Sequence, residues 1–242
     1  MWSETQLWSM KKLLTVICLC LSLSVLAQDN EGISLKTYVE YGYNYTWEHY
    51  GSLSVIGNFP INSHFELEAG LNTNSANIYA LNVKSIVKFP LKVGQLKLEN
   101  RYLYNMLLRN NSNDFCGALS IGYYINHLSV SAGFFARLYG NLVFDSHEGS
   151  VSTIIEPFNL IYSIEGQLFK QDHLWNLGAR ISNHNDFTIE RFNEPIFTLL
   201  GIYKATNSIK LFTEISCKPS GIFHVTANFY SIFGHIGFIY KW

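Results

Sequence analysis

The closing stretch of the chain, Ile232 to Trp242, constrains the fold more than any other part of the sequence. Successive side chains of a β-strand point to opposite faces, so alternate residues of this stretch share a face. One face carries large apolar side chains that include Ile236 and Phe238, while the other mixes polar, charged and small residues such as His235 with two apolar ones. A strand with one lipid-compatible face that ends on an aromatic residue predicts a sheet with an apolar outer surface.

The composition supports a membrane protein that crosses the bilayer with strands. Of the 242 residues, 48% are hydrophobic and only 14% are charged, yet beyond the N-terminal region no apolar segment is long enough for a transmembrane helix. Fifteen Tyr, seventeen Phe and five Trp suit lipid-facing and interfacial bands. The formal net charge of -1 gives no basic field for nucleic acid, so we expect no nucleic-acid partner.

The N-terminal region has the pattern of an export signal. Lys11 and Lys12 precede an apolar core from Leu13 to Leu26, and a small residue follows at the exit. We therefore expect a signal peptide over residues 1–27, or from Met10 if that methionine is the true start, in place of a retained anchor. The remainder, residues 28–242, is expected to form a single domain.

Alternation along this remainder predicts an all-β, antiparallel transmembrane β-barrel of twelve strands. Short and long connections follow one another in turn, which is typical of barrels with tight periplasmic turns and longer external loops. The expected strands cover residues 33–45, 52–59, 65–71, 79–89, 96–104, 119–125, 128–139, 160–168, 175–181, 196–204, 208–216 and 232–242. An even number of strands leaves both chain ends on the periplasmic side.

Several segments are expected to be irregular, and one of them makes the strand count ambiguous. Asp145 to Pro157 and the polar run Asn183 to Pro195 are predicted as external loops. We also assign Lys218 to Tyr230 to an external loop, folded as a short helix or tucked into the mouth, although Ile222 to Tyr230 alternates. A barrel of fourteen strands, with Ser150 to Glu156 and Ile222 to Tyr230 as two further strands, is the alternative.

Four residues of the closing stretch resemble a known signal. His235, Gly237, Tyr240 and Trp242 are similar to the C-terminal signal of Gram-negative outer-membrane β-barrel proteins, in which a polar residue, a glycine and two aromatics end the chain. The resemblance implies an outer-membrane location and contact with the barrel assembly machinery during biogenesis. It implies no cargo, because one barrel architecture serves pores, enzymes and adhesins.

Nearly all charged residues of the predicted strands share the face opposite the apolar one. This partition supports the register, because an Arg or Lys facing lipid at mid-depth costs about 2 to 4 kcal/mol. We expect these charges to pair within a solvated lumen, or alternatively to line a pore that favours anions. The pore-lining candidates are Lys36, Glu40, Glu66, Glu68, Lys84, Lys88, Lys97, Glu99, Arg101, Arg137, Glu165, Arg180, Lys204, Lys210 and Glu214.

Catalytic and metal-binding patterns are weak. His127 and Ser129 faintly resemble the His and Ser pairing of outer-membrane lipid A deacylases, but the predicted topology places them at a periplasmic turn. The histidines are scattered without metal-ligand spacing, so neither a metal nor another cofactor is expected. Cys116 and Cys217 fall on opposite faces, which argues against a disulfide.

One polar loop could hold a cation, although a solvated loop is the simpler expectation. Its four candidate ligands are His184, Asp186, Glu190 and Glu194.

Function is the least constrained part of the prediction. A charged inner face without catalytic chemistry favours a passive channel or small-solute transporter, whose partners are outer-membrane lipid and a small solute. The alternative is a closed structural or surface-binding barrel, with an aromatic outer mouth that binds an external ligand. A lipid-modifying enzyme is the third hypothesis. The mouth residues are Tyr43, Tyr45, Trp47 and Tyr50.

Overall fold

The computed structural model describes residues 32–44, 49–74, 78–107, 112–144, 149–169, 173–220 and 228–242. The expected signal peptide lies outside these residues, as do Tyr45 and Trp47 of the predicted mouth. No helix among the described residues is long and apolar enough to cross a membrane.

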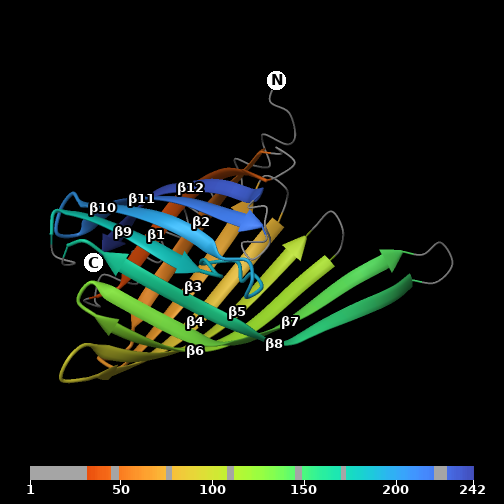
Figure 1. The fold of residues 1–242 in the computed structure, drawn as a ribbon, viewed down its shortest axis with the longest axis horizontal. Coiled ribbons are helices and arrows are strands. Elements are labelled where there is room, and N and C mark those ends of the chain that lie inside the picture. The colour runs from red at the N-terminus through yellow and green to blue at the C-terminus, as the bar shows by residue number, and fades with distance from the viewer. Residues whose placement is uncertain are drawn as a thin grey trace.

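Antiparallel strands pair in chain order and close into one barrel (Figure 1). The closing pair joins β1 to β12, from Ser34 opposite Lys241 to Asn44 opposite Ser231. Both the predicted barrel and the preferred count of twelve strands are therefore confirmed. The strands are β1 (Ser34–Asn44), β2 (His49–Pro60), β3 (Phe65–Asn74), β4 (Ile78–Pro90), β5 (Gln95–Leu107), β6 (Ser112–Ile125), β7 (Leu128–Phe144), β8 (Gly149–Gln167), β9 (Trp175–Ser182), β10 (Ile196–Lys204), β11 (Ile209–Ser220) and β12 (Asn228–Lys241).

Tight turns gather at the end of the barrel that also holds the start of β1 and the end of β12. Asn126 in the β6–β7 turn has a positive φ of 40°, which a two-residue hairpin turn requires and which asparagine tolerates. Gly94 in the β4–β5 turn has φ 78°, and a Cβ there would lie 2.5 Å from the carbonyl oxygen of Tyr124. We call this the periplasmic end, because the resemblance noted in the sequence predicts tight turns on that side.

The outer surface of the barrel is apolar, as the alternation predicts. The exposed side chains include Val39, Leu119, Phe134 and Ile236 from strands around the ring. Asn100 interrupts this face, and its Nδ2 donates a hydrogen bond to the hydroxyl of Tyr102, the next outward residue along β5 (3.1 Å). This apolar belt meets the requirement that a lipid-exposed sheet be closed and hydrophobic.

Two sequence predictions about irregular segments are wrong because strands continue into them. Asp145 to Pro157 is mostly strand, since β7 reaches Phe144 and β8 begins at Gly149. The alternative extra strand, Ser150 to Glu156, is the first part of β8. A register shift opposite Phe135 and Arg137 accommodates Pro157, and proline is tolerated in a sheet at such bulges.

The predicted loop Lys218 to Tyr230 is likewise shorter than expected. β11 continues to Ser220 and β12 begins at Asn228, so both ends of the segment belong to strands. The residues between them lie outside the described part of the chain.

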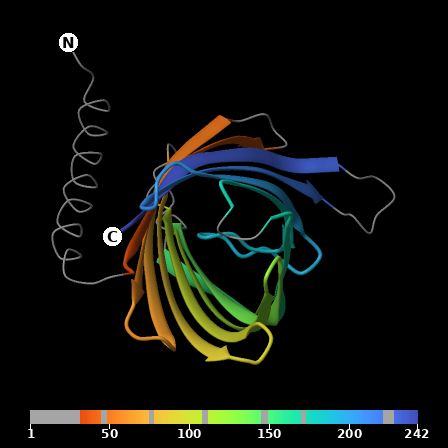
Figure 2. The ribbon, with the colours of Figure 1, turned by 90° about the vertical axis from the view of Figure 1, so that its left-hand side faces the viewer.

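The segment from Asn183 to Pro195 departs most from the prediction, because it folds into the barrel and not outward. Figure 2 shows it as a teal and cyan strip within the ring of strands. β9 ends at Ser182, β10 begins at Ile196, and these two residues pair directly across the strands. We call residues 183–195 the inner loop. It leaves the barrel wall part-way up because β9 pairs with only the Ser163–Gln167 part of the much longer β8.

Candidate pore and its inner loop

Hydrogen bonds within the inner loop give its tip a tight, hairpin-like shape. The side-chain oxygen of Asn185 accepts from the backbone N–H groups of Phe187 (2.9 Å) and Thr188 (2.8 Å). The N–H of Asn185 donates to the carbonyl of Thr188 (2.9 Å), and His184 forms a bridge with Ile189. Asparagine makes such local turns readily, so the tip is defined by its own sequence.

Asn183 joins the base of the inner loop to the exposed edge of β8. Its side-chain amide donates to the carbonyls of Leu160 (2.8 Å) and Glu190 (2.9 Å), and its side-chain oxygen accepts from the N–H of Tyr162 (2.8 Å). Leu160 and Tyr162 are on β8, beyond the part of that strand that β9 reaches, whereas Glu190 belongs to the loop itself. The bonds satisfy backbone polar groups that would otherwise be left unpaired in the wall.

Phe187 anchors the inner loop to one side of the lumen. The lumen is mostly polar here, but this side has an apolar patch in which the phenyl ring is buried. A Cβ added to Gly70 would lie 3.1 Å from that ring, so the glycine on β3 leaves room for it. The patch consists of Tyr38, Ile56, Ala80 and Phe212, from β1, β2, β4 and β11.

Ile189 anchors the inner loop to a different side of the ring, and its side chain is fully buried. Phe187 and Ile189 are only two residues apart, yet they pack against different groups of strands. The loop therefore bridges the lumen between these two groups. The second patch consists of Leu103, Cys116, Ala118, Phe135 and Ile161, from β5 to β8.

Ion pairs and hydrogen bonds reinforce the two apolar anchors. Asp186 Oδ2 accepts from the ammonium of Lys36 (2.8 Å) and from the hydroxyl of Tyr38 (3.2 Å) on β1. On the opposite side, Arg137 donates to the carbonyl of Ile189 (2.5 Å).

Two further ion pairs attach the second half of the inner loop. Glu190 Oε1 lies 3.0 Å from the ammonium of Lys218 on β11, and Arg191 lies 2.6 Å from Glu156 on β8. The inner loop is therefore held by β1, β7, β8 and β11 at once.

The electrostatics of the loop tip favour a charged Asp186 and a neutral His184. Burial alone would raise the pKa of Asp186, but the nearby Lys36, Lys84 and Arg180 outweigh it and bring that pKa far below the usual range. Burial lowers the pKa of His184 well below its ordinary value, and Arg101, Arg180 and Lys84 lower it further.

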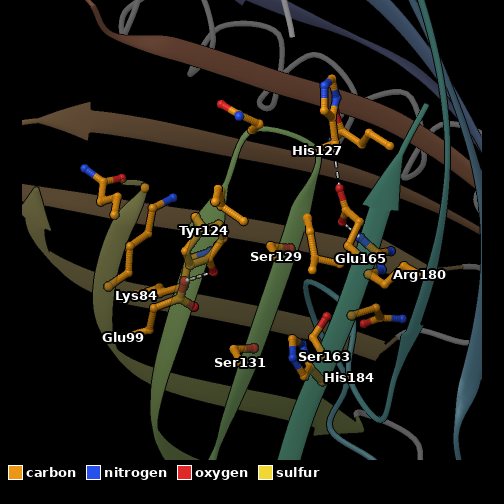
Figure 3. Close-up of a pocket in the computed structure, with 18 of the residues that line it drawn as sticks. Lys84, Glu99, Tyr124, His127, Ser129, Ser131, Ser163, Glu165, Arg180 and His184 are labelled. Atoms are coloured by element: carbon orange, nitrogen blue, oxygen red, sulfur yellow. Dashed lines mark hydrogen bonds and ion pairs between the residues drawn. The ribbon is translucent and has the colours of Figure 1, made fainter. Parts of the chain in front are cut away.

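A polar cavity of about 640 Å³ lies between the tip of the inner loop and the periplasmic turns (Figure 3). Ser129 and Ser131 on β7 and Ser163 on β8 form one part of its wall, and His184 and Asp186 belong to its boundary at the loop. Its charged side chains are Lys84, Lys97, Arg101 and Arg180 against Glu99, Glu165 and Asp186. The cavity is suited to water and small polar solutes.

Tyr124 organises the charges on the β5 and β6 wall of the cavity. Its hydroxyl donates to Glu99 (3.0 Å), and the ammonium of Lys97 lies 3.9 Å from the centre of its ring. This geometry holds the cation of Lys97 at the cavity surface by a cation–π contact.

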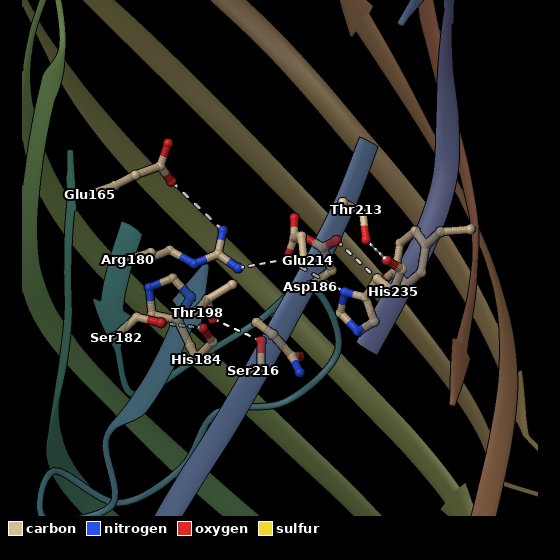
Figure 4. A network of polar contacts seen from close by, with 12 residues as sticks. Glu165, Arg180, Ser182, His184, Asp186, Thr198, Thr213, Glu214, Ser216 and His235 are labelled. Carbon is tan, nitrogen blue, oxygen red and sulfur yellow. Dashed lines mark hydrogen bonds and ion pairs between the residues drawn. The ribbon is translucent and has the colours of Figure 1, made fainter. Parts of the chain in front are cut away.

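A chain of charged groups crosses the wall from β8 to the closing seam (Figure 4). Arg180 lies 3.7 Å from Glu165 and 3.0 Å from Glu214. Glu214 Oε2 lies 3.4 Å from Nδ1 of His235, whose Nε2 contacts Glu40 on β1. His235 therefore joins β11, β12 and β1 where the barrel closes.

The other residues that resemble an assembly signal also make close contacts in the barrel. A Cβ on Gly237 would lie 2.2 Å from the carbonyl oxygen of Thr37, so β1 and Tyr38 pack against a position that only glycine fits. The rings of Tyr240 and Trp242 meet edge to face at 4.7 Å. Their role in assembly stays a prediction.

Several other predicted lining residues form ion pairs, and one of the partners, Asp114, is not in the predicted set. Glu68 lies 2.9 Å from Lys84, Arg137 lies 3.3 Å from Asp114, and Glu66 contacts Lys88. Lys204 and Lys210 stand opposite each other beside the β10–β11 turn. Apart from Lys204 and Lys210, the predicted set thus divides between the cavity wall and charged pairs elsewhere on the inner face.

The sequence analysis missed the residues that hold the inner loop in the lumen, above all Asn183, Phe187 and Ile189. Two apolar side chains at alternate positions within an Asn- and Glu-rich segment are the signal that could have indicated burial. His184, Asp186 and Glu190 are engaged by Arg101, Lys36 and Lys218.

The geometry supports neither hydrolytic chemistry at His127 and Ser129 nor a disulfide between the two cysteines. His127 and Ser129 line the cavity at its periplasmic end, and the buried Nδ1 of His127 has no hydrogen-bond partner among the described residues. Within the described part of the chain no group of His, Cys, Asp and Glu could hold a metal ion. Cys116 and Cys217 are both free thiols.

Comparisons with known proteins identify the architecture. No family model and no curated protein matches the sequence. The translocator domain of the autotransporter NalP from Neisseria meningitidis is a similar solved structure, with 14% identity, 97% of each chain covered and a TM-score of 0.54. The fold is that of a bacterial outer-membrane β-barrel. Together with the apolar belt, this fold places the protein in the outer membrane.

Two further structures similar to this outer-membrane barrel are porins. The KdgM porin, in complex with disordered oligogalacturonate, is 12% identical, with 86% of this chain and 99% of that chain covered and a TM-score of 0.53. The NanC porin is 13% identical, with 85% and 100% covered and a TM-score of 0.51. At these identities the likeness concerns the fold.

Proposed function

We propose that this barrel is a passive channel for small polar solutes and that the inner loop is its constriction. The observation that carries the proposal is the cavity between the periplasmic turns and the tip of the inner loop, with charged and hydroxyl side chains from β4 to β9 in its wall. A hydrated, charged lining lets polar solutes enter without losing all of their hydration.

Similarity to two porins supports a channel over other uses of the fold. The bound oligogalacturonate of the KdgM structure is an acidic sugar. Lys97 and Arg101 at the cavity surface would favour acidic solutes here as well. We therefore include small anionic solutes in the proposed substrate class.

A planar-bilayer recording of the refolded protein tests this function, with a loop-deletion variant as comparison. Because Ser182 and Ile196 pair directly, deleting His184 to Glu194 together with Pro195→Gly leaves an Asn-Gly dipeptide as a two-residue turn between β9 and β10. We expect discrete conductance from the native chain and a larger conductance from the deletion variant. If neither conducts, the protein is not a channel.

A closed barrel is the second candidate, and the contacts of the inner loop with both sides of the lumen favour it. Burial of Phe187 and Ile189 in separate apolar patches would make the loop a plug. Silence from the native chain at every pH and voltage, with conductance only after deletion of the loop, would support this candidate. The protein would then act through its outer surface.

A further inference from the structure

The hydrogen bond between Arg101 and His184 depends on the protonation state of the imidazole. Nη1 of Arg101 lies 3.3 Å from Nδ1 of His184 and 2.8 Å from the carbonyl oxygen of Asn185. Arginine can only donate, so Nδ1 must offer its lone pair when the loop is docked. A proton on Nδ1 would place two donors against each other.

The charged groups that face His184 are mostly cations. They are Arg101 on β5, Arg180 on β9 and Lys84 on β4, whereas Asp186 of the loop itself is the opposing anion and already binds Lys36. The backbone carbonyl of His184 accepts from the hydroxyl of Ser182 (2.7 Å), which fixes the residue in this environment. A proton added to the imidazole would therefore be repelled from three elements of the wall.

We propose that the inner loop is an acid-released gate, in which proton uptake by His184 detaches the loop tip from the wall and widens the channel. The gate regulates the channel of the proposed function and rests on it. No ligand other than the proton is required, because the docked loop binds a proton less tightly than the released loop does. By linkage, acid then shifts the population toward the released state.

The sign of the effect follows from the two states of His184. In the released loop its pKa should return toward about 6.5, whereas in the docked loop it lies well below that value. Docking is therefore unimpaired above about pH 6.5 and weakens as the pH falls below it. Between pH 7.5 and 5.5 the ratio of released to docked loop should rise by up to about tenfold, since each pH unit below the released-state pKa contributes a factor of ten.

The acidic groups of the loop do not account for a release in mild acid. Burial and the neighbouring Glu190 raise the pKa of Glu194, so its protonation relieves repulsion and favours docking. Glu194 therefore opposes His184, so its protonation cannot cause the release that acid is expected to produce. Asp186 stays ionised throughout this range because its pKa is far below the usual one.

The test measures the loop and the channel separately. Hydrogen exchange of the amides of residues 183–195, corrected for intrinsic pH dependence, reports docking in the full-length refolded protein. Bilayer conductance at pH 7.5 and 5.5 reports opening. His184→Asn removes the titrating group and keeps an acceptor for Arg101, with His184→Gln as a second variant if the first does not fold. His127→Gln is the matched control, because His127 lines the same cavity away from the loop.

We expect the native chain and His127→Gln to lose exchange protection and gain conductance at pH 5.5, and His184→Asn to show neither change. The loop-deletion variant should conduct equally at both pH values. Unchanged protection in the native chain, or an undiminished pH response in His184→Asn, would overturn the gate. Failure of the deletion variant to conduct would instead count against the channel, while the exchange data would still decide whether acid releases the loop.

Discussion

Asp186 Oδ2 lies 2.8 Å from the ammonium of Lys36, although the two residues are 150 positions apart in the chain. The hydroxyl of Tyr38 meets the same carboxylate oxygen. The first strand of the barrel therefore holds the tip of a loop that follows the ninth. Because β1 also forms the closing seam with β12, this contact links closure of the barrel to the position of the loop.

Asp186→Asn should weaken docking of the inner loop. The substitution removes the ion pair and leaves the partly buried Lys36 without its partner, at a cost of about 1–3 kcal/mol. We expect faster hydrogen exchange in residues 183–195 and a larger mean conductance. A double-mutant cycle with Lys36→Met isolates the pair from other effects of each change.

The same pair should be insensitive to mild acid. The pKa of Asp186 is depressed, so its contribution to docking is complete above the pKa that it has in the released loop and is lost only as the pH falls below that value. The coupling free energy from the cycle should therefore be equal at pH 7 and pH 5.5. A coupling that halves over this range would contradict the assignment.

Phe187→Ala should release the inner loop more strongly than any single loss of a polar contact. Truncating a buried phenylalanine typically costs about 3–5 kcal/mol, and the ring fills the space that Gly70 leaves. Exchange protection of the loop and single-channel conductance measure the effect. Phe192→Ala is the matched control, because that ring is half exposed and packs edge to face with Tyr162. Equal effects from both variants would rule out Phe187 as an anchor.

His235→Leu should destabilise the closing seam. It would leave the carboxylates of Glu40 and Glu214 facing each other without the ring between them, and removing one partner of a buried ionic group costs about 3–5 kcal/mol. We expect the folded barrel to convert to the unfolded form at a lower temperature in a heat-modifiability gel. Tyr41→Phe on the exposed face of β1 should leave that temperature unchanged.

Lys97→Glu should shift the ion selectivity of the channel toward cations. The ammonium lies at the cavity surface over Tyr124, so reversing its charge changes the field along the solute path. The reversal potential in a salt gradient measures the change. Lys92→Glu makes the same change in charge on the exposed β4–β5 turn and should have a smaller effect. Identical shifts from the two variants would refute a cavity-specific role.

Much of this architecture could be predicted from alternation alone. A strand has a period of two, and a charge facing lipid is costly, so residues such as Lys84 and Leu119 could be assigned to the inner and outer faces without a structure. Strand ends were less predictable. Pro157 ends a segment that was predicted as a loop, and although proline interrupts a regular ladder, the register shift in β8 accommodates it within a strand.

The sequence by itself determined a closed barrel with an apolar exterior, a charged interior and both chain ends on one side, because these follow from local periodicity. Only the tertiary structure decided that residues 183–195 turn inward. That choice depends on long-range contacts, in which Phe187 and Ile189 find apolar patches built from eight different strands and Asp186 meets Lys36. Such patches exist only after the strands have closed, so no local pattern in the loop could specify them.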